Sequence, residues 1–112
     1  MTADEVAKLI TEATDQQMMD LILGLAAWLT LEARVTYEPG TDQVIDTPTL
    51  RRINEIMHRL IAAARHLNDG DRTTATSMLT AYAPGEGRSL SHSLNNAWKN
   101  VLPRWQARTL PK

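Results

Sequence analysis

The chain has 112 residues, of which 43% are hydrophobic and 22% are charged, and we expect one soluble globular domain over residues 1–112. It contains no cysteine, which excludes a disulfide scaffold, thiolate metal sites and a cysteine nucleophile. The formal net charge of −1 argues at first sight against a polyanionic partner.

The sequence has no segment suited to secretion or to a membrane. The N-terminal segment opens with the acidic residues Asp4 and Glu5, whereas a secretory signal opens with basic residues. The most apolar stretch, residues 18–31, contains Asp20 and is too short to span a bilayer. We therefore expect a cytoplasmic protein without a membrane partner.

Apolar residues recur at helical spacing from the start of the chain. Thr2 and Glu5 have the spacing of a capping box, which predicts a short first helix. Thr14 and Gln17 repeat this pattern, so a second helix is expected from about Asp15 to about Tyr37. No glycine or proline separates the two helices, so the capping box of Thr14 and Gln17 is the only signal for the break between them.

A turn and a long third helix follow. Residues 38–42, with the sequence Glu-Pro-Gly-Thr-Asp, predict the turn. Thr47 is expected to be the N-cap of the third helix, with Pro48 at its first position, where the missing N–H costs nothing. This helix should run to about Leu67 and end at Gly70, which suits a left-handed cap.

Two shorter helices complete the chain. The spacing predicts a fourth helix over about residues 72–82, and a loop rich in glycine and proline over residues 83–87. A fifth helix is expected from about Ser89 to Leu102. Pro103 should end or kink it, so residues 103–112 are expected to form a helical turn followed by a mobile tail.

These elements predict an all-α fold, a compact bundle of four to five helices whose long second and third helices form an antiparallel hairpin. The second helix is apolar nearly all round, because Leu23, Ala27 and Leu31 lie away from its main apolar arc. Such a helix must be covered on both sides, by the other helices or by a second copy of the chain. We therefore expect a homodimer.

Glu55 and His58 have the Glu-x-x-His spacing of carboxylate-bridged di-iron bundles, and Glu32 could add a carboxylate. On a helical wheel, however, Glu55 lies almost opposite the apolar arc of its helix. The residues expected in that arc are Ile53, Met57, Leu60, Ile61, Ala64 and Leu67. We therefore favour a solvated face on which Glu55 pairs with Arg51 and Arg59 at i,i+4 spacing, and we predict no metal and no cofactor.

Glu32 falls inside the apolar arc of the second helix. A carboxylate in that position must be paired, protonated or close enough to the helix end to reach water. We favour a structural ion pair or hydrogen bond, with Arg65, Arg51 and Asn54 as candidate partners. An interface contact and a catalytic role are the alternatives.

Charge is divided unequally along the chain. Residues 1–46 hold two basic and nine acidic residues, a net charge of −7. Residues 47–112 hold ten basic and four acidic residues, a net charge of +6. The near-neutral total therefore combines two halves of opposite charge, and it does not exclude a polyanionic partner.

Three interpretations of this division are open. Acidic and basic helices can lie side by side and give a mixed surface. The basic C-terminal region can instead bind a protein, or it can contact nucleic acid. For stacking on a base, Trp105 is the freer indole because it lies beyond Pro103, whereas Trp98 lies in the apolar stripe of its helix. The residues expected to bind the partner are Arg88, Lys99, Arg104, Trp105 and Arg108.

The sequence thus predicts a small non-enzymatic protein–protein interaction module, of the adaptor, regulator or inhibitor type, that also associates with itself. A nucleic-acid-associated regulator that uses the basic C-terminal region is the alternative. A metal-binding or enzymatic protein centred on Glu32, Glu55 and His58 is the third hypothesis.

Overall fold

The computed structural model describes residues 2–84 and 92–109 of the chain. Within these residues the chain forms five α-helices and one short 3-10 helix, which confirms the predicted all-α bundle. The α-helices are α1 (Ala3–Glu12), α2 (Asp15–Ala33), α3 (Thr47–Asn68), α4 (Arg72–Thr80) and α5 (His92–Thr109), and the 3-10 helix is η1 (Arg34–Thr36).

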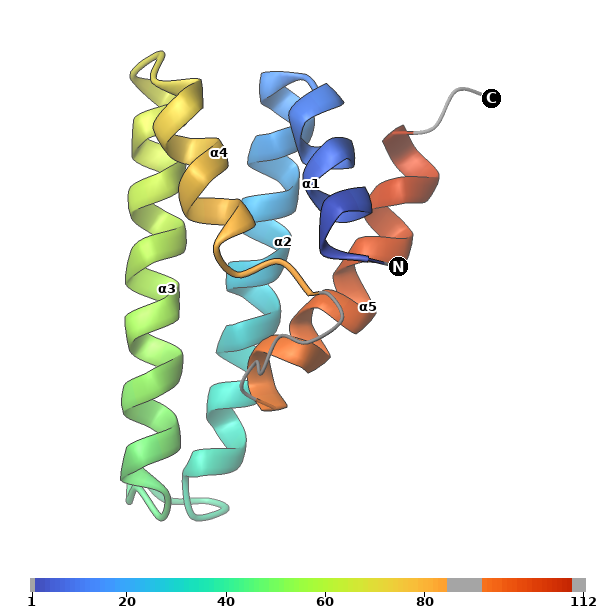
Figure 1. Ribbon diagram of the computed structural model, residues 1–112. Helices are drawn as coiled ribbons and strands as arrows, with labels where there is room; N and C mark the ends of the chain where they lie inside the picture. Colours follow the sequence, from blue (N-terminus) through green and yellow to red (C-terminus); the bar gives the residue numbers. More distant parts are fainter. Residues whose placement is uncertain (1, 85–91, 110–112) are drawn as a thin grey trace.

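The helix α2 lies at the centre of the bundle. Figure 1 shows α2 and α3 running antiparallel as a long hairpin, as predicted, with α5 against another side of α2 and α4 folded back along α3. The short α1 contacts α4 near the start of α2. One apolar cluster with members from all five helices fills the space between them. None of the described helices combines the length and apolarity that crossing a bilayer requires.

The first two helices begin at the predicted caps. The Thr2 hydroxyl accepts a hydrogen bond from the Glu5 amide at 3.1 Å. Thr14 and Gln17 form a complete capping box, because the side chain of each accepts a hydrogen bond from the backbone amide of the other. These bonds satisfy amides that have no partner inside their own helix. Between the two helices Ala13 is extended, so α1 and α2 are separated without glycine or proline.

The helix α2 ends at Ala33 rather than at the predicted Tyr37. The chain then tightens into η1, where the buried Thr36 fixes the turn. Its hydroxyl donates to the Ala33 carbonyl at 2.6 Å, and its carbonyl accepts from the Ile45 amide at 2.7 Å. Tyr37 and Val44 form an isolated antiparallel bridge, which closes the predicted turn.

The helices α3 and α4 are both capped at the N-terminus by an aspartate. The N-cap of α3 is Asp46 and not the predicted Thr47, because the Asp46 carboxylate accepts a hydrogen bond from the Thr49 amide at 3.1 Å. Asp71 caps α4 in the same way, through the Thr74 amide at 3.1 Å. Hydrogen bonds from the side chain and amide of each threonine lower the pKa of the capping carboxyl group.

The ends of α3 and α4 are close to those predicted. Gly70 follows α3 in the left-handed conformation with φ of +87°, as expected for a glycine cap. The amide of Gly70 donates to the Leu67 carbonyl at 3.1 Å, which satisfies one of the last carbonyl groups of the helix. The helix α4 ends at Thr80, slightly before the predicted residue 82.

The helix α5 continues through Pro103 to Thr109, so the predicted end at Leu102 is wrong, and the helical turn expected beyond Pro103 is longer than predicted. A proline inside a helix removes one N–H donor and crowds the preceding turn. Burial of Trp105 on the far side of the proline offsets that cost. The predicted start of this helix at Ser89, and residues 110–112, lie outside the described residues.

The buried face of α3 is turned relative to the predicted arc. Ile56 and Ala63 are buried, whereas Ile61, which was expected in the core, is 43% exposed. The prediction used the pattern of this helix alone, but α2 and α4 both pack on it and together decide which residues are covered. The residues buried as predicted are Ile53, Leu60 and Leu67.

Arg72 connects α4 to the junction of α1 and α2. Its Nη1 donates to the Asp15 carboxylate at 2.6 Å. Its Nη2 lies within hydrogen-bond distance of the carbonyl oxygens at the end of α1, those of Ile10, Thr11 and Ala13. Carbonyl groups at a helix C-terminus need partners from outside the helix. One guanidinium group thus holds the end of α1 and the start of α2 against α4.

Gly24 allows α2 and α5 to approach closely. A Cβ atom on Gly24 would lie 3.0 Å from Cγ1 of Val101, which is tighter than an ordinary van der Waals contact. A glycine in the middle of a helix is destabilising by about 0.5–1 kcal/mol relative to alanine. The close contact with α5 is the physical reason for a glycine at this position.

We expect Asp46→Asn combined with Asp71→Asn to make the protein less sensitive to acid. Folding lowers the pKa of both carboxyl groups below 3.8, so their contribution to stability is fully present only at a pH well above that unfolded value and is lost as the pH falls through the folded pKa values. Asparagine caps helices about as well but does not titrate. Thermal unfolding followed by circular dichroism between about pH 2 and pH 6 measures the effect. Parallel pH profiles for the two proteins would contradict it.

We expect Arg72→Met to lower the free energy of unfolding by about 2 kcal/mol, because hydrogen bonds to a charged group contribute roughly 1.5–3 kcal/mol. The corresponding fall in Tm is roughly 10 °C for a domain of this size. Thermal denaturation measures it, with the exposed Arg59→Met as control, for which a change within about 0.5 kcal/mol is expected. Equal shifts for the two variants would show that the contacts of Arg72 do not stabilise the fold.

Candidate functional site

The outer side of α2 carries apolar side chains that the other described helices leave exposed. Leu23 is 55% exposed, Leu31 is 47% exposed, and Ala27 between them is exposed as well. This confirms that the three residues lie away from the buried arc of the helix. The buried residues of α2 are Met18, Leu21, Ile22, Leu25 and Leu29. We call Leu23, Ala27 and Leu31 the α2 outer stripe.

A groove between α2 and α3 extends the α2 outer stripe. Leu23 and Ala26 line it from α2. Ile61 and Ala64 line it from α3. The polar residues along the groove are Arg65, Asn68 and Asp69. The rotation of α3 relative to the prediction therefore adds an apolar residue, Ile61, to the exposed surface beside the stripe.

A second group of exposed apolar residues lies at the tip of the α2–α3 hairpin. Val35 is 68% exposed and Ile45 is 64% exposed, and they border a hollow together with Tyr37, Arg34 and residues 38–42. This surface was not predicted from the sequence. Side chains in a turn follow no regular period, so their spacing does not indicate which of them are covered.

Glu32 forms a hydrogen bond within its own helix. Nε1 of Trp28 donates to Oε1 of Glu32 at 3.1 Å, and the contact is partly buried. The predicted structural hydrogen bond is therefore present, but its partner is Trp28 rather than Arg65, Arg51 or Asn54. The i,i+4 spacing of the two residues was the signal that could have identified this partner.

Glu55 and His58 are both exposed on α3. Oε2 of Glu55 lies 3.6 Å from Nη1 of Arg52, at i,i+3 spacing. This pair replaces the predicted i,i+4 pairs with Arg51 and Arg59, and it contributes little because both side chains are solvated. Within residues 2–84 and 92–109, no three histidine, cysteine, aspartate or glutamate side chains form a group that could hold a metal ion.

The basic residues predicted to bind a partner are only partly brought together. Lys99, Arg104 and Arg108 are exposed on α5, and Arg88 lies outside the described residues. Arg104 and Arg108 share one face of α5 at i,i+4 spacing, whereas Lys99 is about 140° away from Arg104 around the helix. The three cations therefore do not form a single stripe.

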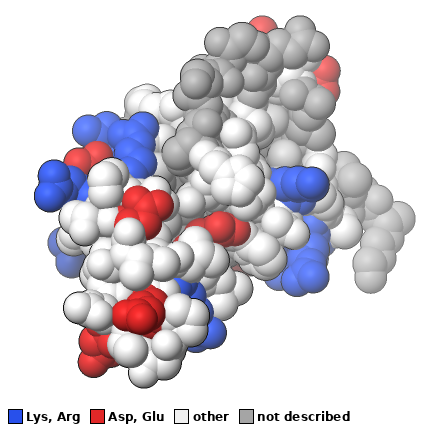
Figure 2. All heavy atoms as spheres, turned by 90° about the horizontal axis from the view of Figure 1, so that it is seen from below, with Lys and Arg blue, Asp and Glu red and all other residues white. Residues whose placement is uncertain are grey.

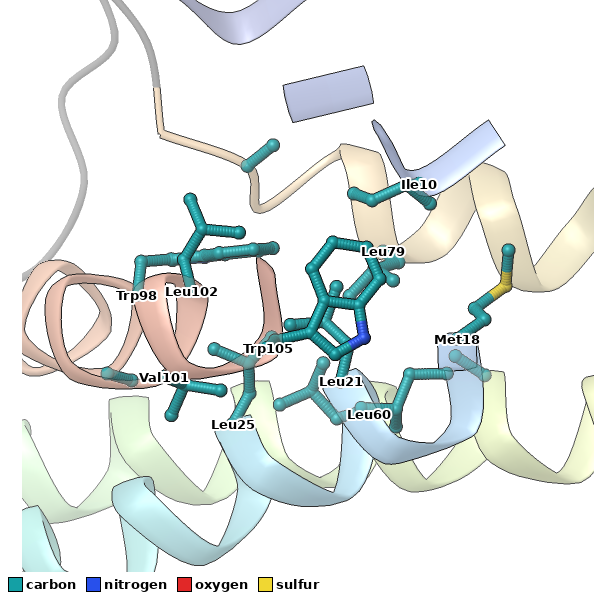
Figure 3. Packing of buried hydrophobic residues seen from close by; sticks show 14 of the residues in the cluster. Ile10, Met18, Leu21, Leu25, Leu60, Leu79, Trp98, Val101, Leu102 and Trp105 are labelled. Atoms are coloured by element: carbon teal, nitrogen blue, oxygen red, sulfur yellow. The ribbon is translucent and has the colours of Figure 1, made fainter. Parts of the chain in front are cut away.

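Trp105 is 1% exposed, so the expectation that it is the freer indole is wrong. Its Nε1 donates to the Gln17 carbonyl at 2.7 Å, and Figure 3 shows the ring reaching from α5 toward Leu21 of α2. Trp98 is buried, as predicted. Because both indoles are inside the bundle, neither is placed on the surface for stacking on a base. The prediction failed because it ended α5 before Trp105.

The charges seen from the end of the molecule that carries the α2–α3 connection are mixed. Figure 2 shows basic side chains over α3 on the left and beside α5 on the right, with acidic side chains between them. Side chains of both charges are thus mixed on this face. This arrangement supports the mixed-surface interpretation of the charge division.

No known family model, curated protein or solved structure matches this chain. The candidate site is therefore defined by geometry alone. Its main part is the α2 outer stripe with the adjoining groove, and the tip of the hairpin is a second apolar surface. Both belong to the α2–α3 hairpin, whereas the exposed cations of α5 lie elsewhere on the bundle.

We expect Trp105→Phe to lower the free energy of unfolding by about 1–2 kcal/mol, because it removes the hydrogen bond to Gln17 and part of a buried ring. Urea unfolding followed by circular dichroism measures the change. Trp28→Phe is the matched control, since it removes an indole hydrogen bond that is only partly buried. A larger loss for Trp28→Phe than for Trp105→Phe would contradict the anchoring role of Trp105.

Proposed function

We propose that this chain is a cytoplasmic protein–protein interaction module without enzymatic activity, and that it binds its partner through the outer side of the α2–α3 hairpin. The observation that carries the proposal is the α2 outer stripe. Three apolar residues at i,i+4 spacing, Leu23, Ala27 and Leu31, are exposed on one side of a helix whose other sides are packed. Exposed apolar patches with a polar rim are typical of interaction sites.

The surroundings of the stripe fit the usual anatomy of an interface. The apolar groove beside it continues the surface onto α3 through Ile61. Arg65 and Asp69 also line this groove and supply polar groups to it. Interfaces commonly combine an apolar centre with a polar rim. Each leucine is about half exposed, so a partner that covers it removes roughly half of its apolar area from water. This burial contributes about 1 kcal/mol per leucine to the free energy of binding.

The side chains that suggested chemistry favour structural roles. Glu32 accepts the hydrogen bond of Trp28, and Glu55 lies beside Arg52 on a solvated face. A catalytic acid or base is expected in a cleft together with the groups that tune it. Glu55 and His58 are instead exposed on the surface of α3. These observations support an interaction module over a metal-binding or enzymatic protein.

The exposed cations of α5 support the alternative, a nucleic-acid-associated regulator, less strongly. Arg104 and Arg108 can contact two phosphate groups along one face of the helix. Trp105, which was expected to stack on a base, is buried. The remaining contacts would be electrostatic, so binding should weaken steeply as the salt concentration rises.

We expect Leu23→Lys combined with Leu31→Lys to abolish capture of the partner from a lysate of the native cell, because two charges would be placed in the apolar centre of the interface. Immobilised wild-type and variant proteins are compared by mass spectrometry of the retained proteins. Circular dichroism should show an unchanged fold, since both side chains are already exposed.

Arg104→Glu combined with Arg108→Glu is the control for that experiment, because it changes two exposed residues on α5 and leaves the hairpin intact. This variant should retain the partner. Loss of capture in the arginine variant together with normal capture in the leucine variant would contradict the proposal. If the captured material were then lost on nuclease treatment, the nucleic-acid alternative would be supported.

A further inference from the structure

We propose that the partner on the α2 outer stripe is a second copy of this chain, with the two α2 helices packed antiparallel about a twofold axis at Ala27. The proposal rests on the proposed function, because it names the partner of the same surface. It is carried by a pattern of exposed residues that is symmetric about Ala27 in position and complementary in charge.

The pattern consists of five exposed residues on one side of α2. Leu23 and Leu31 lie four residues before and after Ala27. Asp20 and Arg34 lie seven residues before and after it, and both are exposed. At about 100° per residue, all four fall within about 40° of the direction of Ala27 around the helix. Arg34 directly follows α2 with helical backbone angles (φ −61°, ψ −31°), so the periodicity extends to it.

Antiparallel packing about Ala27 brings unlike groups together. Residues at equal distances before and after Ala27 face each other across the twofold axis. Leu23 of each copy therefore meets Leu31 of the other, which forms an apolar centre. Asp20 of each copy meets Arg34 of the other, which forms two ion pairs at the ends of that centre. Parallel packing would instead place Asp20 beside Asp20 and Arg34 beside Arg34, so repulsion between like charges disfavours it.

The side chains at the centre allow the two helices to approach closely. Ala27 is small and lies on the axis, and small residues at a crossing point permit short distances between helices. Thr30 is the exposed polar residue beside it, and its hydroxyl donates to the Ala26 carbonyl at 3.0 Å. Its hydrogen-bonding group is therefore satisfied within α2. Burying Thr30 in the interface leaves no unsatisfied hydroxyl donor.

The charged residues at the ends of the stripe have the geometry for the proposed pairs. Oδ1 of Asp20 accepts a hydrogen bond from Nε2 of Gln16 at 3.0 Å, which holds the carboxylate against the helix surface. Its second oxygen can accept from a guanidinium group. Arg34 sits at the end of α2 and also borders the hollow at the hairpin tip. The long arginine side chain can therefore reach across the interface from the end of its helix.

The decisive experiment reverses each charge separately and then mixes the two variants. We expect Asp20→Arg alone and Arg34→Asp alone each to raise the dissociation constant of the dimer by about tenfold or more. Each substitution places like charges opposite each other at both ends of the interface. An equimolar mixture of the two variants should restore association, since one chain then carries two cations and the other two anions. Sedimentation equilibrium at low salt measures all of these dissociation constants.

Glu55→Arg and Arg59→Asp are the matched controls, because they make the same charge changes at exposed positions of α3. Each should keep the dissociation constant of the wild type within about threefold, since both sites lie off the stripe. A wild-type dimer that the Asp20 and Arg34 variants leave unchanged would overturn the proposed register. A mixture that stays monomeric while the wild type dimerises would overturn it as well.

A cross-linking measurement tests the axis independently, because the chain has no cysteine of its own. Ala27→Cys should form a disulfide-linked dimer under mild oxidation, since the two copies of residue 27 meet at the axis. Leu23→Cys should not, because the two copies of residue 23 are offset by eight residues, or about 12 Å along the helices. Linkage of both variants would indicate parallel packing and contradict the proposal.

The outcomes separate this inference from the proposed function. A monomeric wild type that still captures a different protein through Leu23 and Leu31 would overturn the second copy as partner and leave the interaction module standing. A dimer that tolerates lysine at both leucine positions would show that association uses another face, which contradicts the inference. A monomeric protein whose captured proteins do not depend on these leucines would contradict both.

Discussion

The burial of α2 is the constraint on which the rest of the structure depends. This helix is apolar on nearly every side, so each of its faces needs a neighbour. The helix α3 covers one side and α5 another, while the core side chains of α1 and α4 complete the same apolar cluster. Gly24 permits α5 to approach α2 closely, and Trp105 joins the two helices by a hydrogen bond. The outer stripe is the side that this arrangement leaves exposed.

Signals carried by a few neighbouring residues were sufficient for much of the fold. The caps at Thr2 and Thr14, the turn over residues 38–42 and the left-handed Gly70 all depend on local hydrogen bonds and backbone angles. Even the error at the start of α3 was local, because Asp46 and its neighbour Thr47 are both good caps. Periodicity also separated the outer stripe from the buried arc of α2.

The failures share a different cause, which is packing between distant segments. The sequence pattern could not show that α5 continues through Pro103, because that depends on burying Trp105 against the start of α2. The rotation of α3 that exposes Ile61 depends on where α4 and α2 pack. For the candidate site, the stripe itself was predictable, whereas the groove beside it and the hairpin tip were not. Helical periodicity indicates which face of a helix is apolar, but it does not indicate which other helices pack on that face.

The hydrogen bond between Trp105 and Gln17 joins residues 88 positions apart, and this separation has a consequence for synthesis on the ribosome. Because α5 emerges from the ribosome after α2 and α3, these two helices can pair before the face of α2 that α5 will cover has its neighbour. During that interval α2 exposes two apolar faces, one that the chain later covers itself and one that it leaves exposed. Docking of α5 therefore removes one of the two apolar faces through which the nascent chain could associate with others.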